Sequence, residues 1–210
     1  MTVLEDIKEA TRTGDENRVN LLTKQAIDEG VEVDQIVKEG FIAAMVIVGK
    51  EFGDGKIYIP EMLIAARAMK GGLETVKPFI AGGKVKTIAK IVLGTVQGDL
   101  HDIGKNLVAM MLEGCGMEVI DLGVDVTPEK FVEALKTHKP KFVGMSALLT
   151  TTMTSMKATV EAMEEAGLRK NVKILVGGAP VSQAFADEIG ADGFGLNASE
   201  AVERVKENLS

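Results

Sequence analysis

The sequence contains a single cysteine and no tryptophan, and aromatic side chains make up only 4% of its 210 residues. The single cysteine, Cys115, excludes an internal disulfide framework and favours a reducing compartment. The sequence also lacks any run of about 18 apolar residues, so no membrane span is expected. The acidic residues 1–9 lack the apolar core of a signal peptide. We therefore expect a cytoplasmic protein.

Basic residues are outnumbered by acidic ones, which gives a net charge of −7. This balance argues against nucleic acid or an anionic membrane as the main partner. Hydrophobic residues make up 46% of the chain, so a substantial core can be buried. The length suits one large domain or two small ones.

Apolar residues in the first 80 positions recur at helical spacing. Gly14 and Asp15 predict a turn and an N-cap, Asp34 predicts a second N-cap, and Pro60 suits the first turn of a helix. Four amphipathic helices joined by short turns predict a bundle. The expected helices are 3–11, 16–28, 34–48 and 59–80.

After the glycine-rich residues 81–84, which predict a linker, short apolar runs alternate with helical patterns. Alternation repeated five times predicts a parallel sheet with helices on both faces, a doubly wound α/β domain. We therefore divide the chain into a helical domain, 1–83, and an α/β domain, 84–210. The expected strands are 88–96, 118–122, 141–146, 172–177 and 191–194, and the expected helices are 106–115, 128–137, 153–166, 181–189 and 198–208.

The run 98–106 places His101 on the loop after the first expected strand, with Asp99 two residues before it and Gly104 three after. Open α/β sheets bind ligands at this edge. A carboxylate that holds one ring nitrogen of a histidine fixes the tautomer and leaves the other nitrogen free for a metal or for general-base catalysis. His138, by contrast, is expected at a solvated helix end. Two histidines so placed, with Cys115 in a helical pattern, do not form a four-ligand zinc site.

Two further loops are expected at the same edge of the sheet. Gly177, Gly178 and Ala179 end one strand and either turn the chain or let a ligand approach the backbone closely. The hydroxyl-rich run 146–155 either caps the next helix or lines a pocket. Three convergent loops favour a ligand pocket, and none of them matches a phosphate-binding glycine motif.

In the helical half, Phe52, Ile59 and Met62 are either core residues of the bundle or an apolar lid over a ligand. Spacing alone leaves both readings open.

The set Asp99-x-His101-x-x-Gly104, with Ser146-x-Leu148 and Gly177-Gly178, resembles the corrinoid-binding signature of vitamin B12-dependent methyltransferases and mutases. The wider run 94–106 closely resembles the cobalamin-binding module of methionine synthase, and residues 52–62 resemble the cap of that module. With both halves and nothing else, the chain looks like the small corrinoid proteins of methanogen and acetogen methyltransferase systems. These systems serve methanol, methylamines, methoxylated aromatics or betaines.

The resemblance implies a four-helix cap followed by a Rossmann-like (flavodoxin-like) five-stranded domain that holds cobalamin or a related corrinoid. It implies that His101 ligates the cobalt, that Asp99 bonds its other nitrogen, and that Thr152 replaces the serine which completes this relay in methionine synthase. The remaining expected contacts fall into four groups. The loop contacts are Gln97, Gly98, Leu100, Asp102, Ile103 and Gly104; the tunnel for the nucleotide tail is lined by Ser146, Leu148 and Thr150 and passes Gly177, Gly178 and Ala179; the far end of the tail meets Asn197 and Ala198; and Phe52, Ile59 and Met62 cover the methyl face.

The function so implied is a methyl shuttle that is not catalytic alone. Cobalt(I) accepts a methyl group from a substrate:corrinoid methyltransferase, and the methylcobalamin form presents it to a second methyltransferase with a pterin or thiol acceptor. A reductive activase is a further expected partner. Three alternatives remain open. The first is a corrinoid-binding sensor, which would usually add a DNA-binding segment, and the second is the cobalamin subunit of a mutase, which has no need of a methyl-shielding cap. The third is a plain doubly wound domain without a metal.

Overall fold

The computed structural model describes residues 2–79 and 87–209. These residues form two compact units, one helical and one α/β. The expected linker at 81–84, and with it the proposed domain boundary between residues 83 and 84, lies outside the described residues.

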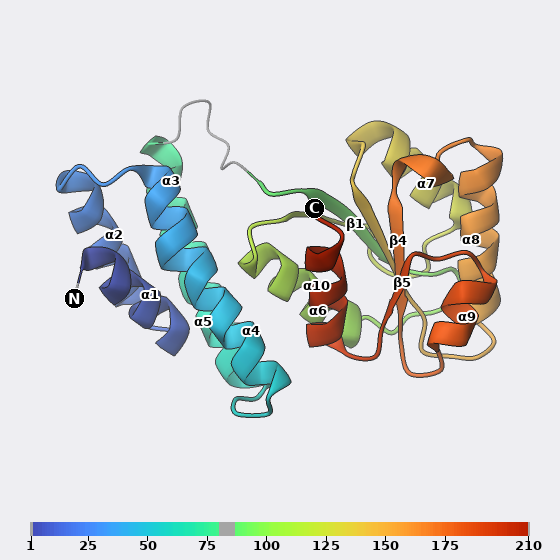
Figure 1. Ribbon diagram of the computed structural model, residues 1–210, viewed down its shortest axis with the longest axis horizontal. Coiled ribbons are helices and arrows are strands. Elements are labelled where there is room, and N and C mark those ends of the chain that lie inside the picture. Colours follow the sequence, from blue (N-terminus) through green and yellow to red (C-terminus); the bar gives the residue numbers. More distant parts are fainter. Residues whose placement is uncertain (1, 80–86, 210) are drawn as a thin grey trace. The chain divides into compact units, whose positions relative to one another are not determined.

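The first unit is built from helices, as its apolar spacing predicts (Figure 1). Asp15 caps the second helix by accepting the backbone N–H of Arg18, as expected. The expected cap at Asp34 is wrong: the N-cap position is Glu32, two residues earlier, and Asp34 instead pairs with Lys38. The elements are α1 (Val3–Thr13), α2 (Glu16–Asp28), α3 (Val33–Gln35), the π-helix η1 (Ile36–Ile42), α4 (Ala43–Gly53), α5 (Ile59–Val76) and the 3-10 helix η2 (Lys77–Phe79).

The second unit is a five-stranded parallel sheet in the order β2-β1-β3-β4-β5. This is the flavodoxin-like order of doubly wound folds, so the predicted fold class is confirmed. Its strands are β1 (Lys90–Thr95), β2 (Glu118–Asp121), β3 (Phe142–Ser146), β4 (Lys173–Gly177) and β5 (Gly193–Gly195). Its helices are α6 (Ile103–Gly114), α7 (Pro128–His138), α8 (Met153–Glu165), the 3-10 helix η3 (Arg169–Asn171), α9 (Gln183–Glu188) and α10 (Ala198–Glu207).

Helices cover both faces of this sheet, with α7 and α8 on one side and α6 and α10 on the other (Figure 1). Side chains alternate along each strand, so one face of β1 and β3 sends Val92 and Val143 into the core that contains Phe131 of α7. The opposite face carries Ile91 and Leu93.

After β1 the chain continues to β2 on one side of the sheet, and after β3 it continues to β4 on the other side. The carboxyl ends of the adjacent strands β1 and β3 are therefore the switch point of the sheet. Ligands bind at such points because the two following loops separate and leave a crevice. The loop with His101 follows β1, and the hydroxyl-rich loop follows β3. Within residues 2–79 and 87–209, every helix is too short or too polar to cross a lipid bilayer.

Gly94 provides a test of the packing between β1 and α7. A Cβ atom at this position would lie 2.7 Å from Cζ of Phe131, so Gly94→Ala overpacks the core and should cost about 1–3 kcal/mol of stability. Shortening the ring by Phe131→Leu should relieve the clash, so the double variant should lose less than the sum of the two single variants. Urea unfolding followed by circular dichroism measures this coupling, and strictly additive losses would contradict the packing described.

Candidate functional site

The centre of the site is the buried carboxylate of Asp99, which accepts hydrogen bonds from five donors. Its Oδ1 accepts the backbone N–H of His101 at 3.0 Å and lies 2.7 Å from Nδ1 of the same residue. Its Oδ2 accepts the backbone N–H groups of Leu148 at 2.7 Å and Leu149 at 3.3 Å. The same oxygen accepts the hydroxyl of Thr152 at 2.7 Å. One carboxylate therefore joins the loop after β1 to the loop after β3.

These bonds decide the ionisation of the carboxylate. Burial raises the pKa of Asp99, but the bonds from Thr152, Leu148 and His101 outweigh burial and hold its pKa well below the usual range. Asp99 is therefore an anion that can only accept hydrogen bonds.

An anionic Asp99 also fixes the tautomer of His101. The proton between the two side chains must sit on Nδ1, so in the neutral imidazole Nε2 carries a free lone pair. No described residue forms a hydrogen bond with Nε2, and the His101 side chain is 53% exposed. The site thus presents one oriented nitrogen ligand at the carboxyl edge of the sheet.

Thr152 does not cap α8; it makes the contact with Asp99 that the family resemblance implied. It precedes the first residue of α8, but its side chain makes no capping bond. Its hydroxyl lies 2.7 Å from Oδ2 of Asp99 and 2.9 Å from the carbonyl of Leu149. Because a bond to an ionised acceptor is the stronger one, the hydroxyl proton is directed to Asp99.

Two hydroxyls that the sequence interpretation missed hold the backbone of the same loop. The buried Thr95, at the end of β1, donates to the carbonyl of His101 at 2.9 Å. Ser155, in α8, donates to the carbonyl of Gln97 at 3.0 Å. Thr95 could have been noticed as a polar residue at the end of a buried strand.

Asp125, in the loop after β2, was also missed. Its Oδ1 accepts the backbone N–H of Gly98 at 2.8 Å, and its own N–H donates to the carbonyl of Asp99 at 3.0 Å. Its φ of 53° is a left-handed conformation that most residues avoid. This strained residue therefore clamps the peptide that precedes His101 from the side opposite β3.

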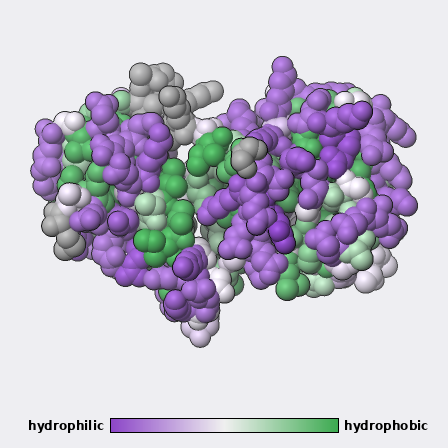
Figure 2. Space-filling model, viewed as in Figure 1, coloured by the Kyte–Doolittle hydropathy of each residue, from purple (hydrophilic) through white to green (hydrophobic). Residues whose placement is uncertain are grey.

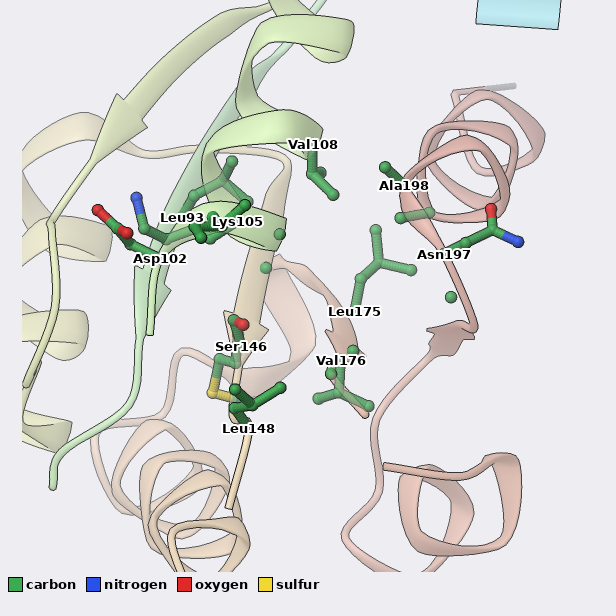
Figure 3. Close-up of a pocket in the computed structure, with 18 of the residues that line it drawn as sticks. Leu93, Asp102, Lys105, Val108, Ser146, Leu148, Leu175, Val176, Asn197 and Ala198 are labelled. Atoms are coloured by element: carbon green, nitrogen blue, oxygen red, sulfur yellow. The ribbon is translucent and has the colours of Figure 1, made fainter. Parts of the chain in front are cut away.

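A cavity of about 540 Å³ lies beside this loop, within the α/β unit (Figure 3). Most of the residues expected to touch a cofactor line it: Leu100, His101, Asp102, Ile103, Gly104, Ser146, Leu148, Gly177, Gly178, Ala179, Asn197 and Ala198. Of the expected residues in the α/β unit, five do not line it: Gln97, Gly98, Asp99, Thr150 and Thr152. Of these, Asp99 and Thr152 are buried and act on His101, whereas Thr150 is exposed.

The depth of the cavity comes from residues that no motif marked. They are hydrocarbon side chains of β1, β4, α6 and α10, namely Ile91, Leu93, Leu175, Val108, Leu112, Ala201 and Val205. On α10 the lining residues Ala198, Ala201 and Val205 follow helical spacing.

Large apolar side chains stand exposed around the mouth of the cavity. Ile103 is 80% exposed, and Leu100 and Leu196 are each 71% exposed. Figure 2 shows hydrophobic atoms at the lower edge of this unit, the edge at which the strands end in Figure 1. Contiguous exposed apolar residues around a cavity are typical of a ligand-binding surface.

The backbone conformation and close packing at position 178 require a glycine. Its φ is 128°, and an added Cβ would overlap the carbonyl oxygen of Ala147. The glycine thus lets the end of β4 turn close to β3, and it also lines the cavity. Asn197 likewise has a local role, because its Oδ1 accepts the N–H of Glu200 at 2.9 Å and so caps α10.

Phe52, Ile59 and Met62 belong to the helical unit. Met62 is fully buried, Phe52 is half-buried and Ile59 is 42% exposed, so the interpretation of all three as bundle core is wrong for Ile59. His138 ends α7 and is partly exposed, at the helix terminus where it was expected.

Across residues 2–79 and 87–209, no three histidine, cysteine, aspartate or glutamate side chains come together to hold a metal. A metal at His101 would receive one protein nitrogen, and its other ligands would have to come from a partner molecule. An oriented imidazole beside an apolar cavity with an apolar rim fits a metal carried in a large, mostly hydrocarbon macrocycle. The fold and the site therefore define an α/β protein that holds a metal-bearing macrocyclic cofactor.

Comparison with known proteins identifies the cofactor class. The sequence model of the B12 binding domain matches residues 89–205, and a second B12 binding domain model matches residues 3–77. The chain belongs to the B12-binding family of corrinoid proteins, as its motifs predicted, and its cofactor is a cobalt-containing corrinoid.

Similar proteins cover almost the whole chain. Trimethylamine corrinoid protein 2 of Methanosarcina mazei is 44% identical over 93% of this chain and 90% of its own length. A cobalamin-binding protein from Desulfitobacterium hafniense is similar in structure, with a TM-score of 0.80 and 34% identity over 99% of this chain and 98% of its own. One chain in the crystal structure of the methanol:cobalamin methyltransferase complex of Methanosarcina barkeri matches with a TM-score of 0.90 and 30% identity, over 99% of this chain and 79% of that one.

Asp99→Asn tests the five-donor carboxylate. An amide must place its NH2 group against either the backbone N–H of His101 or those of Leu148 and Leu149, so one set of donors loses its acceptor. The expected loss is about 1–3 kcal/mol of unfolding free energy at pH 7 in the cofactor-free protein, measured in urea. The folded-state pKa of Asp99 lies below its unfolded value, so this stabilisation is complete above about pH 5 and is lost as the pH falls further. The difference between the proteins should therefore shrink on acidification.

Asp125→Asn is the matched comparison. An asparagine keeps an acceptor oxygen for Gly98 and tolerates the left-handed conformation, so its cost should stay below about 0.5 kcal/mol. Equal losses at both positions would contradict the argument from acceptor number.

Proposed function

We propose that this protein carries methyl groups on its corrinoid between two methyltransferases. The observation that carries the proposal is the single nitrogen, Nε2 of His101, fixed by Asp99 at the mouth of the apolar cavity. When bound, a corrinoid supplies a cobalt centre that takes up a methyl group in its reduced state and gives it to an acceptor.

His101 would hold the cofactor through Nε2, because Nδ1 is committed to Asp99. The negative charge of Asp99 makes the imidazole a stronger donor, and Thr152 holds that carboxylate in position. The proton at Nδ1 would thus adjust how strongly Nε2 of His101 donates to the cobalt. In this way the protein could favour one oxidation state of the cobalt over another.

The cavity would receive the part of the corrinoid that hangs below the ring. Its apolar walls exclude water from the lower side, and Gly177 and Gly178 leave the entrance free of side chains. Asn197 and Ala198, at the start of α10, lie on the side of the cavity opposite Asp102 and Lys105 (Figure 3).

The helical unit would cover the methyl side. Phe52, Ile59 and Met62 lie where α4 ends and α5 begins, and Ile59 together with the neighbouring Leu63 exposes apolar surface. Such a cover would keep water and oxidants away from a reactive bond and would have to move when an enzyme approaches. The division of the chain into two compact units supports this motion.

The partners are two methyltransferases, and a reductive activase is a further partner. A donor from the methylamine class is favoured, because the trimethylamine corrinoid protein is 44% identical to this chain. The match to the methanol:cobalamin methyltransferase complex, at 30% identity, supports direct docking of a methyltransferase. Reconstituted with cobalamin and reduced, the protein should transfer methyl groups from a methylamine only when the matching methyltransferase is added.

Nitrogen coordination by His101 can be tested by electron paramagnetic resonance. The chain has only two histidines, so labelling all histidine rings with 15N is simple to interpret. In the cobalt(II) form, coordination by His101 should change the nitrogen splitting from three lines to two on labelling. His138→Ala should leave this change intact, and His101→Ala should abolish it while some corrinoid stays bound. A three-line pattern that persists in the labelled wild type would contradict the ligand assignment.

Shielding by the helical unit can be tested by photolysis. Protein loaded with methylcobalamin should lose its methyl group faster in light and air when Phe52→Ala opens the cover. Phe79→Ala, at an exposed position of the same unit, is the control and should decay at the wild-type rate. Equal decay rates in the wild type and both variants would contradict the shielding role of Phe52 and leave it a packing residue of the helical unit.

A further inference from the structure

The charged groups that line the cavity are turned away from it and already bonded. Lys105 is 5% exposed, and its Nζ donates to both carboxylate oxygens of Asp121 at 2.6 and 2.7 Å and to Oδ1 of Asn106 at 2.7 Å. Asp102 accepts the amide of Asn106 at 3.0 Å. In Figure 3 the polar ends of Asp102 and Lys105 point to the side, away from the space near Val108.

The amide at the opposite end of the cavity is engaged as well. Asn197 accepts the N–H of Glu200 at 2.9 Å and donates to its carboxylate at 3.3 Å. Figure 3 shows this amide turned outward, while Leu175 and Ala198 present hydrocarbon to the interior.

The floor of the cavity offers no backbone groups either. Leu93, Gly144 and Leu175 lie in register across β1, β3 and β4, whose N–H and C=O groups pair with one another. Gly144 makes room on this floor for the side chain of Leu93, because an added Cβ atom would overlap the Cδ2 atom of Leu93. Leu112 and Val205 close the other side.

One hydroxyl remains. Ser146 lines the cavity, and its Oγ has no hydrogen-bond partner among the residues that the structure describes. Apart from Nε2 of His101, which the proposed function commits to the metal, the described lining therefore offers one polar side chain without a hydrogen-bond partner, and the walls around it are hydrocarbon.

Resting on the proposed function, we propose that this cavity selects the lower base of the corrinoid and takes a benzimidazole-type base in preference to an aminopurine. A methylated benzimidazole has one acceptor nitrogen, which suits a single hydroxyl, and its other edge is hydrocarbon. An aminopurine carries an exocyclic amine and further ring nitrogens, which would lose water here and find no partner. Burial of an unpaired polar group opposes binding strongly, whereas burial of methyl groups favours it.

The test is a titration of the cofactor-free protein with three corrinoids, measured by equilibrium dialysis. Cobalamin carries dimethylbenzimidazole, adeninylcobamide carries adenine, and cobinamide lacks the nucleotide. Cobalamin should bind about tenfold or more tightly than adeninylcobamide, which is the discrimination expected for one unpaired polar group. Equal binding of the first two, with or without an advantage over cobinamide, overturns base selection but leaves the proposed function standing. Failure of all three to bind overturns the proposed function itself.

Gly144→Ala shows whether the base enters this cavity. The added methyl group should push Leu93 into the space and reduce the affinity for cobalamin towards that for cobinamide, which should bind as before. Gly94→Ala is the matched control, because its methyl group meets Phe131 on the opposite face of the sheet and should leave the difference between cobalamin and cobinamide unchanged. An unchanged cobalamin affinity in Gly144→Ala would place the base elsewhere and contradict the proposal.

Discussion

Five hydrogen-bond donors meet on the two oxygens of Asp99, and the rest of the site depends on this meeting. The carboxylate must be anionic to accept all five, and an anion beside Nδ1 of His101 leaves Nε2 free to coordinate. The same carboxylate ties the loop after β1 to the loop after β3, so the ligand nitrogen and the cavity wall that contains Leu148 share one support. A neutral side chain at this position would loosen both together.

The sheet topology explains why this support stands where it does. The strand order places β1 and β3 side by side while their chains depart in opposite directions, so a crevice forms at their carboxyl ends. Small residues of β3, β4 and α10 then deepen the crevice into a cavity whose walls are hydrocarbon. On the proposed function, His101 would supply one metal ligand and the apolar cavity a binding site for the lower part of the cofactor, whose own metal would bring the reactive chemistry.

Much of this could be predicted from the sequence because periodicity and strand-end placement act locally. The alternation of strands and helices, the loop position of His101 and the pairing with Asp99 two residues away all follow from short-range patterns. Features that depend on distant segments could not be found in this way. Asp125 and Ser155 act on the loop from 27 and 58 residues away in sequence, through contacts that exist only after folding. Thr152 lies in a run that local pattern assigns to helix caps; its bond to Asp99 was expected from the family resemblance alone, and the structure shows its hydroxyl at that carboxylate.

Nitrogen NMR of the cofactor-free protein tests the central claim most directly. With 15N-labelled histidine, and with His138→Ala to assign the signals, the two ring nitrogens of His101 can be observed separately at about pH 8.5, where an ordinary imidazole is neutral. The account predicts a protonated Nδ1 and an unprotonated Nε2 as the single tautomer. A proton on Nε2, or rapid averaging between the two nitrogens, would show that Asp99 does not orient this imidazole and would contradict the account.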